Sequence, residues 1–164
     1  MSRKRVIVTG GTGLIGGALV DLLRERGDEV VVLSRGAGPD SWDPADGRLD
    51  PKLLEGADAV VNFNGVSIGP STLLEAPTRR FTSKHRAAIL DSRVDSTRLL
   101  AETMASLSDK PAVFVSSSAI GYYGDTGDTP VDETGPRGDG FLADVVVAWE
   151  AAAEPARSAG VRLA

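Results

Sequence analysis

Short apolar runs alternate along the chain with longer segments in which apolar residues recur every three or four positions. The short runs are typical of parallel strands buried on both faces, and the longer segments are typical of amphipathic helices. Strands are predicted over residues 5–9, 29–33, 58–62, 111–116 and 160–164, with a further short strand near Trp42. Helices are predicted over residues 14–26, within 71–108 (86–107 most clearly) and over 141–158. This alternation predicts an α/β fold, a doubly wound parallel sheet with helices on both faces.

A cluster of glycines lies between the first predicted strand and the first predicted helix. Gly10, Gly13 and Gly16 are spaced by three in the segment TGGTGLIGG. Gly10 permits a tight turn, Gly13 lets the backbone approach a pyrophosphate, and Gly16 lets the helix pack against the strand. The strand–turn–helix context predicts a dinucleotide site on the helix N-terminus, and with it a Rossmann fold, rather than a structural turn alone. The cofactor-binding residues predicted here are Gly10, Thr12, Gly13, Leu14, Ile15 and Gly16.

The identity of the dinucleotide depends on the residues that follow the second predicted strand. An acidic residue there binds the ribose 2′-hydroxyl of NAD, whereas an arginine accommodates the 2′-phosphate of NADP. This chain has Ser34 and Arg35 at that position and no acid. Because a guanidinium binds phosphate in bidentate fashion, NADP(H) is the predicted cofactor, with NAD(H) as the alternative. The competing interpretation makes Arg35 an ordinary solvated charge.

Composition narrows the remaining functions. The 164 residues contain no cysteine and one histidine, which excludes disulfides and thiolate metal sites and argues against a histidine-based metal site. A Mg²⁺ site made only of carboxylates stays open, although none is predicted. The formal net charge of −5 argues against general nucleic-acid binding, which requires a basic surface. No apolar run approaches the roughly 18 residues of a membrane span, so we expect a cytoplasmic domain without nucleic-acid or membrane partners.

Recognisable motifs run through nearly the whole chain, in the segments TGGTGLIGGALVDLLRERGDEVVVLSR, SWDPADGRLDPKLLEGADAVVNFNG, ILDSRVDSTRLL, VFVSSSAIGYYGD and FLADVVVAWEAAAEPARSAGVRLA. Together they resemble the short-chain dehydrogenase/reductase superfamily, in its extended NAD-dependent epimerase/dehydratase branch. Within that branch the chain is most similar to an atypical subgroup of epimerase-like oxidoreductases. The resemblance implies that Phe63, Asn64 and Gly65 line the adenosine and ribose side of the cofactor. It also implies that Ser116 and the two serines after it face the nicotinamide half.

The usual catalytic residues of that superfamily are partly replaced in this chain. Active members combine a serine with a Tyr-x-x-x-Lys pair, in which the Tyr hydroxyl transfers a proton and the Lys ammonium lowers the pKa of that hydroxyl. Ser118 stands at the serine position, but Phe141 and Val145 stand where the resemblance places the Tyr and the Lys. Arg93 stands in place of an asparagine. It is either a cation that holds a cofactor phosphate or a substrate carboxylate, or an ordinary arginine of a helix surface.

Two tyrosines that follow the serines offer alternative proton donors. Tyr122 and Tyr123 lie in residues 119–140, a segment rich in Gly, Asp and Thr that is longer than a simple connection. The interpretation that we favour is that both rings pack this loop. Trp42 lies in a polar connection, and we expect it to be semi-exposed beside the adenine. The predicted catalytic candidates are Ser118, Tyr122 and Tyr123, and the cofactor-binding residues predicted outside the glycine turn are Ser34, Arg35, Phe63, Asn64, Gly65, Arg93 and Ser116.

Two functions fit these observations. The favoured one is an NADP(H)-dependent oxidoreductase or epimerase acting on an unidentified small molecule, in which Ser118 orients a substrate carbonyl or hydroxyl. The alternative is an NADP(H)-binding sensor with little or no catalysis, supported by Phe141 and Val145. Residues 1–164 are expected to form one NAD(P)-binding domain that ends within its sixth strand, without the C-terminal substrate lobe of its relatives. The sequence leaves the substrate, the reaction direction and the oligomeric state open.

Overall fold

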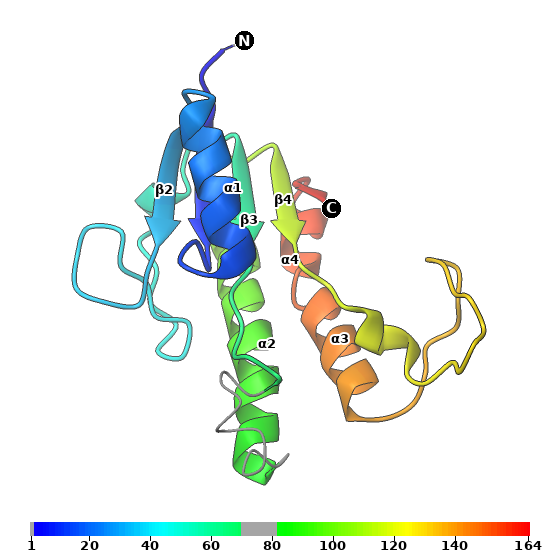
Figure 1. The fold of residues 1–164 in the computed structure, drawn as a ribbon. Coiled ribbons are helices and arrows are strands. Elements are labelled where there is room, and N and C mark those ends of the chain that lie inside the picture. Colours follow the sequence, from blue (N-terminus) through cyan, green and yellow to red (C-terminus); the bar gives the residue numbers. More distant parts are fainter. Residues whose placement is uncertain (1, 70–81) are drawn as a thin grey trace.

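Five parallel strands form one sheet in the computed structural model, which describes residues 2–69 and 82–164. The strand order is β2-β1-β3-β4-β5 (Figure 1). The strands are β1 (Arg5–Thr9), β2 (Glu29–Leu33), β3 (Ala59–Asn62), β4 (Val113–Ser116) and β5 (Arg162–Leu163). Parallel neighbours joined by helical crossovers confirm the predicted α/β architecture. The carboxyl ends of β1, β3 and β4 meet at one edge of the sheet, where ligands bind in such folds.

Helices cover both faces of the sheet. The helix α1 (Leu14–Glu25) lies on one face, and α2 (Ser83–Ser106) and α4 (Glu154–Ser158) cover the other, while α3 (Phe141–Ala151) packs against α2 (Figure 1). Two short 3₁₀ turns, η1 (Pro51–Leu53) and η2 (Ile120–Tyr123), lie in the connections. No helix in the described part of the chain is both long and apolar enough to cross a membrane.

The strand β1 is buried on both faces, as its apolar run predicts. Ile7 belongs to the core beneath α2 and α4, whereas Val6 and Val8 belong to the core beneath α1. Because side chains alternate along a strand, one short run of β-branched residues contributes to both cores. This burial fixes the direction in which β1 ends, and therefore the position of the glycine turn that follows it.

Two predicted helix boundaries differ from those in the structure. The predicted helix over 141–158 is divided into α3 and α4, because Pro155 in the first turn of α4 has no N–H to continue the hydrogen-bond ladder. The helix α2 begins earlier than residue 86, because the Thr82 hydroxyl accepts a hydrogen bond from the His85 N–H and caps the helix. The predicted helical residues 71–81 lie outside the described part.

Two expectations for the Trp42 region, a further strand and a semi-exposed ring, are wrong, while its position beside the adenine stays a prediction. No sheet strand forms there; single bridges join Ser34 to Ser41 and Asp43 to Arg48. Trp42 is only 2% exposed and belongs to the core beneath α2 and α4, so it is not semi-exposed. The Trp42 N–H donates to the Ser34 carbonyl (3.1 Å), which holds the connection against the end of β2 while the large ring is buried.

Candidate cofactor and catalytic site

The glycine turn after β1 is shaped by close backbone approaches. Gly10 has φ +67°, and a Cβ at this position would lie 2.7 Å from the carbonyl oxygen of Phe63. A side chain at Gly10 is therefore excluded both by the left-handed backbone and by the end of β3. The Gly13 N–H donates to the Gly10 carbonyl (3.0 Å), and Gly13 is the N-cap of α1. The turn consequently aims the N-terminus of α1 at the edge of the sheet where the strands end.

Gly16 permits the closest approach within this turn. A Cβ there would lie 2.3 Å from the Gly10 carbonyl oxygen, so the first turn of α1 packs directly on the turn backbone. The side chains of Leu14 and Ile15, which open the helix, are 93% and 68% exposed. Steric contacts with the turn backbone thus explain why glycine is needed at positions 10 and 16. The N-terminus of α1 lies open, beside the exposed side chains of Leu14 and Ile15.

The glycine turn and the end of β2 line a common groove. One cavity of about 250 Å³ is lined by predicted cofactor residues from three strand ends, namely Gly10, Thr12, Ser34, Arg35 and Asn64. A second cavity of about 240 Å³ shares Arg35 and Asn64 with the first and continues along α2. Its lining includes the acidic residues Asp43, Asp91 and Asp95. Because Arg35 and Asn64 line both cavities, we describe the two cavities as one groove, which an extended ligand can occupy.

A buried chain of hydrogen bonds joins this groove to α3. Thr9 Oγ1 donates to Asn62 Oδ1 (2.6 Å), and Asn62 Nδ2 donates to Thr97 Oγ1 (2.9 Å). Trp149 Nε1 donates to the same Thr97 oxygen (2.9 Å), and the Asn64 N–H donates to Asn62 Oδ1 (3.2 Å). Thr9, Asn62 and Thr97 are fully buried. The network therefore connects the ends of β1 and β3 with α2 and α3, and no sequence motif had indicated it.

Arg93 is neither a solvated surface residue nor part of the groove lining. Its Nη1 donates to the carbonyls of Val66 (3.0 Å) and Ile89 (3.1 Å), and its guanidinium carbon lies 5.2 Å from the centre of the Trp149 ring. A Cβ at Gly65 would lie 3.1 Å from the same carbon. The lack of a side chain at Gly65 therefore leaves room for the Arg93 guanidinium. Burial lowers the pKa of Arg93, which still carries its charge at neutral pH. A contact between Arg93 and a cofactor or substrate stays a prediction.

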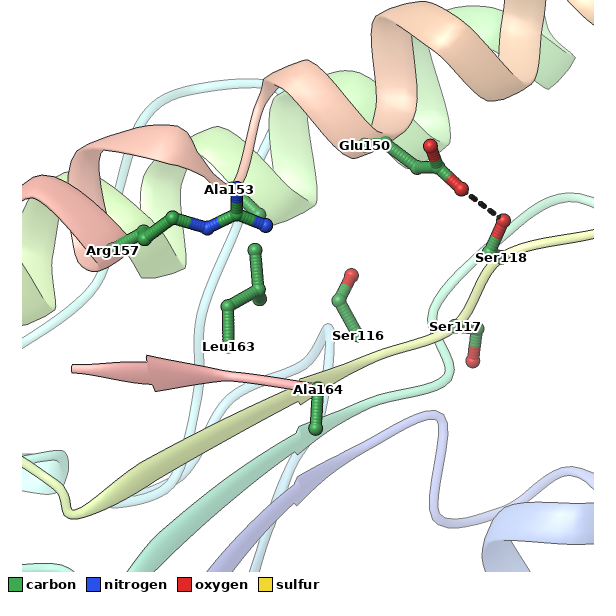
Figure 2. A pocket seen from close by; sticks show the side chains of 8 residues that line it. All are labelled: Ser116, Ser117, Ser118, Glu150, Ala153, Arg157, Leu163 and Ala164. Carbon is green, nitrogen blue, oxygen red and sulfur yellow. Dashed lines mark hydrogen bonds between the residues drawn. The ribbon is translucent and has the colours of Figure 1, made fainter. Parts of the chain in front are cut away.

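The three serines at the carboxyl end of β4 point in different directions (Figure 2). Ser117 Oγ donates to the Asn62 carbonyl (2.9 Å) and ties the end of β4 to the end of β3. Ser118 Oγ donates to Glu150 Oε1 at 2.5 Å, and Figure 2 shows Glu150 reaching from α3 toward Ser118. Ser116 Oγ is buried and has no hydrogen-bond partner within the described residues. Ser116 and Ser118 line a cavity of about 290 Å³, which is separate from the two that form the groove.

The positions of the usual Tyr-x-x-x-Lys pair carry no proton-transfer group. Phe141 lies with its ring 4.3 Å from the guanidinium carbon of Arg86, and Val145 is only 2% exposed. Tyr122 and Tyr123 form η2 and pack edge to face, with ring centres 5.2 Å apart. The Gly138 N–H donates to the Tyr122 carbonyl (2.9 Å), and a Cβ at Gly135 would lie 3.1 Å from the Tyr123 ring. The Tyr123 ring therefore packs against the Tyr122 ring and the loop at Gly135, and a catalytic role of either hydroxyl stays a prediction.

The fold and the glycine turn define a dinucleotide-binding Rossmann domain. Residues 6–139 match the model of the NAD dependent epimerase/dehydratase family, and the chain belongs to this family. An epimerase family protein of Mycobacterium tuberculosis is 37% identical over 99% of this chain and 52% of its own length. The chain spans about half the length of the curated relatives it matches. The predicted membership of the short-chain dehydrogenase/reductase superfamily is confirmed.

Two solved structures extend this comparison. A nucleoside-diphosphate sugar epimerase from Corynebacterium glutamicum is 37% identical, with a TM-score of 0.79 over 99% of this chain and 33% of its own. The human epimerase family protein SDR39U1 (isoform 2), solved with NADPH, is 36% identical, with a TM-score of 0.76 over 91% of this chain and 48% of its own.

Proposed function

We propose that this chain is the NADP(H)-binding domain of an epimerase-like oxidoreductase that acts on an unidentified small molecule. The observation that carries the proposal is the position of Arg35, which lines the same groove as the glycine turn and follows β2 with no acid beside it. Arginine at this position accommodates a 2′-phosphate, whereas NAD sites place an acid there. The NADPH in the human relative supports the same preference, with NAD(H) as the weaker ligand.

The residues of the groove fit the two ends of the cofactor differently. The open N-terminus of α1, with no Cβ at Gly10, Gly13 or Gly16, suits the pyrophosphate. Three acidic residues, Asp43, Asp91 and Asp95, are among those that line the cavity along α2, and their negative charge disfavours a phosphate there. We therefore place the 2′-phosphate on the side of Ser34 and Arg35 and the uncharged adenine along α2. Phe63, Asn64 and Gly65 would line the ribose side, with Arg93 behind Gly65.

The bound cofactor would supply hydride transfer to or from a substrate carbon. The residues of this chain would then bind and orient the reacting oxygen. Ser118 lies just past the end of β4, at the edge where ligands bind in such folds, and its hydroxyl is the candidate group for that oxygen. Phe141 and Val145 offer neither hydroxyl nor ammonium, so the proton must move through other groups. We further propose a cytoplasmic protein without nucleic-acid or membrane partners, consistent with its net charge of −5.

Fluorescence titration with NADPH and NADH tests the cofactor assignment. We expect NADPH to bind more tightly, and Arg35→Ala to weaken NADPH about 10- to 100-fold while NADH changes little, because only the 2′-phosphate contact is removed. Arg24→Ala, in the last turn of α1 and away from the groove, is the matched control and leaves both affinities unchanged. Tighter binding of NADH than of NADPH by the wild-type chain would refute the assignment.

A second candidate function is a sensor of the NADPH/NADP⁺ ratio with little chemistry. The observation that favours it is the burial of Val145 and the packing of Phe141 against Arg86 at the usual catalytic positions. NADPH oxidation in the presence of diacetyl, benzaldehyde and menadione discriminates the two functions. Tight NADPH binding without oxidation by any of the three compounds favours the sensor, and oxidation favours the enzyme.

A further inference from the structure

The shortest side-chain contact at the end of β4 joins a serine to a carboxylate from a distant part of the chain. Ser118 Oγ donates to Glu150 Oε1 at 2.5 Å, a distance typical of a hydroxyl bound to an ionised acceptor. Ser118 lies two residues beyond β4, and Glu150 lies in the last turn of α3 (Figure 2). Because α3 packs against α2 through Trp149, the neighbouring Glu150 is turned away from α2 and toward β4. The contact thus follows from the way α3 is docked.

The cavity beside this pair is lined by both polar and apolar residues, and one buried hydroxyl near it has no partner within the described residues. Its volume is about 290 Å³, enough for a small polar part of a ligand, and Arg157 lines it along with Ser116, Ser118 and Glu150. Figure 2 shows Ser116 pointing into the cavity, and its buried Oγ has no partner within the described residues. A buried hydroxyl without a partner is uncommon. The polar residues Ser118, Glu150 and Arg157 line the cavity and are the ones that can bind a polar ligand group. The Ser118–Glu150 pair therefore borders a space in which a polar ligand group would be stabilised.

We propose that Glu150 is a positioning residue that orients the Ser118 hydroxyl and takes up its proton, in place of the missing Tyr and Lys. The inference rests on the proposed function. Ser118 is the catalytic residue in contact with the substrate hydroxyl, and Glu150 acts through it. The Glu150 carboxylate lies at hydrogen-bond distance from Ser118 and can take up a proton, whereas Phe141 and Val145 carry no group that can.

The proton and electron balance of the step is complete. In alcohol oxidation the substrate O–H bond breaks and its proton passes to Ser118 Oγ, while the Ser118 proton passes to Glu150 and forms a carboxylic acid. The carbon–hydrogen bond of the substrate breaks at the same time, and its hydride reduces NADP⁺, the oxidant of the proposed function. The alcohol becomes a carbonyl compound. In reduction every transfer runs in the opposite direction, so Glu150 then supplies the proton.

Glu150→Gln separates proton transfer from structure. Glutamine keeps an oxygen that accepts the Ser118 hydrogen bond, but it cannot take up the proton. With NADP⁺ and benzyl alcohol, cyclohexanol or galactose as probes, we expect kcat to fall about 100-fold, the usual scale of general acid–base assistance. The rise of the wild-type rate with pH should be absent in the variant. The NADPH dissociation constant should be unchanged, which shows that any loss does not come from the cofactor site.

Glu154→Gln is the matched control, because Glu154 accepts a hydrogen bond from Ser158 (3.1 Å) on the exposed face of α4 and does not line the cavity. Its ion pair with the cavity residue Arg157 (3.6 Å) is solvent-exposed, and such pairs contribute little. It should leave the rate and its pH profile unchanged. Equal rates for the wild-type chain and Glu150→Gln would overturn the inference, as would NADPH binding without turnover of any probe by the wild-type chain. Absence of NADPH binding would instead refute the proposed function on which the inference rests.

Carbon NMR of the glutamate carboxyl groups gives a readout without cofactor. Ser118→Ala should shift the Glu150 signal and leave the Glu154 signal in place, whereas Ser158→Ala should do the reverse. An unchanged Glu150 signal in Ser118→Ala would show that the pair does not form in solution, and would overturn the inference before any assay of turnover.

Discussion

The two halves of the sheet carry their chemistry in different ways. Around β1, the glycine turn is made of backbone: Gly10 has a positive φ, and a Cβ at Gly16 would lie 2.3 Å from the Gly10 carbonyl oxygen, so neither position has room for a side chain. Around β4 and α3, the site is made of side chains, and its principal contact joins Ser118 to Glu150. A site made of backbone depends on local geometry, whereas a site made of side chains depends on how distant elements are docked. The first tolerates few changes, and the second can exchange its reacting groups while the fold persists.

The buried network is where the two halves meet. Thr97 accepts hydrogen bonds from Asn62, at the end of β3, and from Trp149, on α3. The same Asn62 accepts from Thr9, which directly precedes the glycine turn. A change at Thr97 therefore acts on both halves, whereas a change in the turn or at Phe141 acts on one. We therefore expect a substitution at Thr97 to affect both the glycine turn and α3, and substitutions elsewhere to affect one of them.

Gly16→Val should have the largest effect. The new side chain would overlap the Gly10 carbonyl, and overpacking against backbone destabilises by about 3 kcal/mol or more. We expect a large fall in the thermal unfolding midpoint and loss of NADPH binding. Gly17→Ala is the control, because its Cβ would lie 3.6 Å from the nearest atom in ordinary contact, and alanine in a helix gains about 0.5–1 kcal/mol over glycine. A Gly16→Val chain that still binds NADPH would contradict the steric account of the turn.

Thr97→Val should follow in size. It preserves the shape of the side chain but leaves the Asn62 and Trp149 donors without their acceptor, at about 1–3 kcal/mol for each buried group. We expect a loss of about 2–3 kcal/mol in urea unfolding, together with a change in Trp149 fluorescence. Thr103→Val is the control, since the Thr103 hydroxyl donates to the Leu99 carbonyl of its own helix (2.7 Å). A loss no greater than that of Thr103→Val would mean that the network does not couple the two halves.

Features made of residues close together in the chain were predicted from the sequence, whereas contacts between distant residues were not. The glycine turn and the bounds of β1 and β2 follow from residues close together in the chain, and the structure agrees with them. Glu150 and the partners of Thr97 lie 32 to 52 residues away from the groups they contact, so no local pattern marks them. Trp42 was misjudged because its polar neighbours do not reveal that the chain folds back beneath β2. Long-range docking, which sequence spacing does not encode, decides these positions.

Acid should destabilise the part of the sheet around β1 and β2 before the part around β4 and α3. The Lys4 N–H holds the pKa of Asp28 below its ordinary value, and the Lys4 side chain does the same for Asp58, which also accepts from the Arg5 N–H. Because the folded pKa values are lowered, this stabilisation is present above the ordinary value of about 3.9 and is lost as the pH falls through the lowered values. The network around Thr97 is uncharged and does not titrate.

Hydrogen exchange below about pH 4 measures this difference. We expect the amides of β1 and β2 to lose protection before those of β4 and α3. Asp132, whose pKa is lowered by the nearby Thr134, lies in an exposed loop, so its titration should not open an element. Asp28→Asn should remove part of the pH dependence, and Asp132→Asn should leave it intact. Simultaneous loss of protection in both halves would show that the sheet unfolds as one unit in acid.

Phe141→Tyr should have the smallest effect. It tests the site around β4 and α3 directly. It restores the hydroxyl of the usual pair, but Val145 supplies no ammonium to lower a tyrosine pKa from its ordinary value of about 10. We expect NADPH affinity and the rate of carbonyl reduction to change by less than about 2-fold, and stability by less than about 0.5 kcal/mol, as for most changes outside the core. Phe141→Leu, which removes the ring that packs on Arg86, controls for loss of that contact. A tenfold rise in rate would mean that the site around α3 has kept the geometry of the Tyr-dependent site and has lost only the hydroxyl. An unchanged rate is expected if Ser118 and Glu150 now transfer the proton.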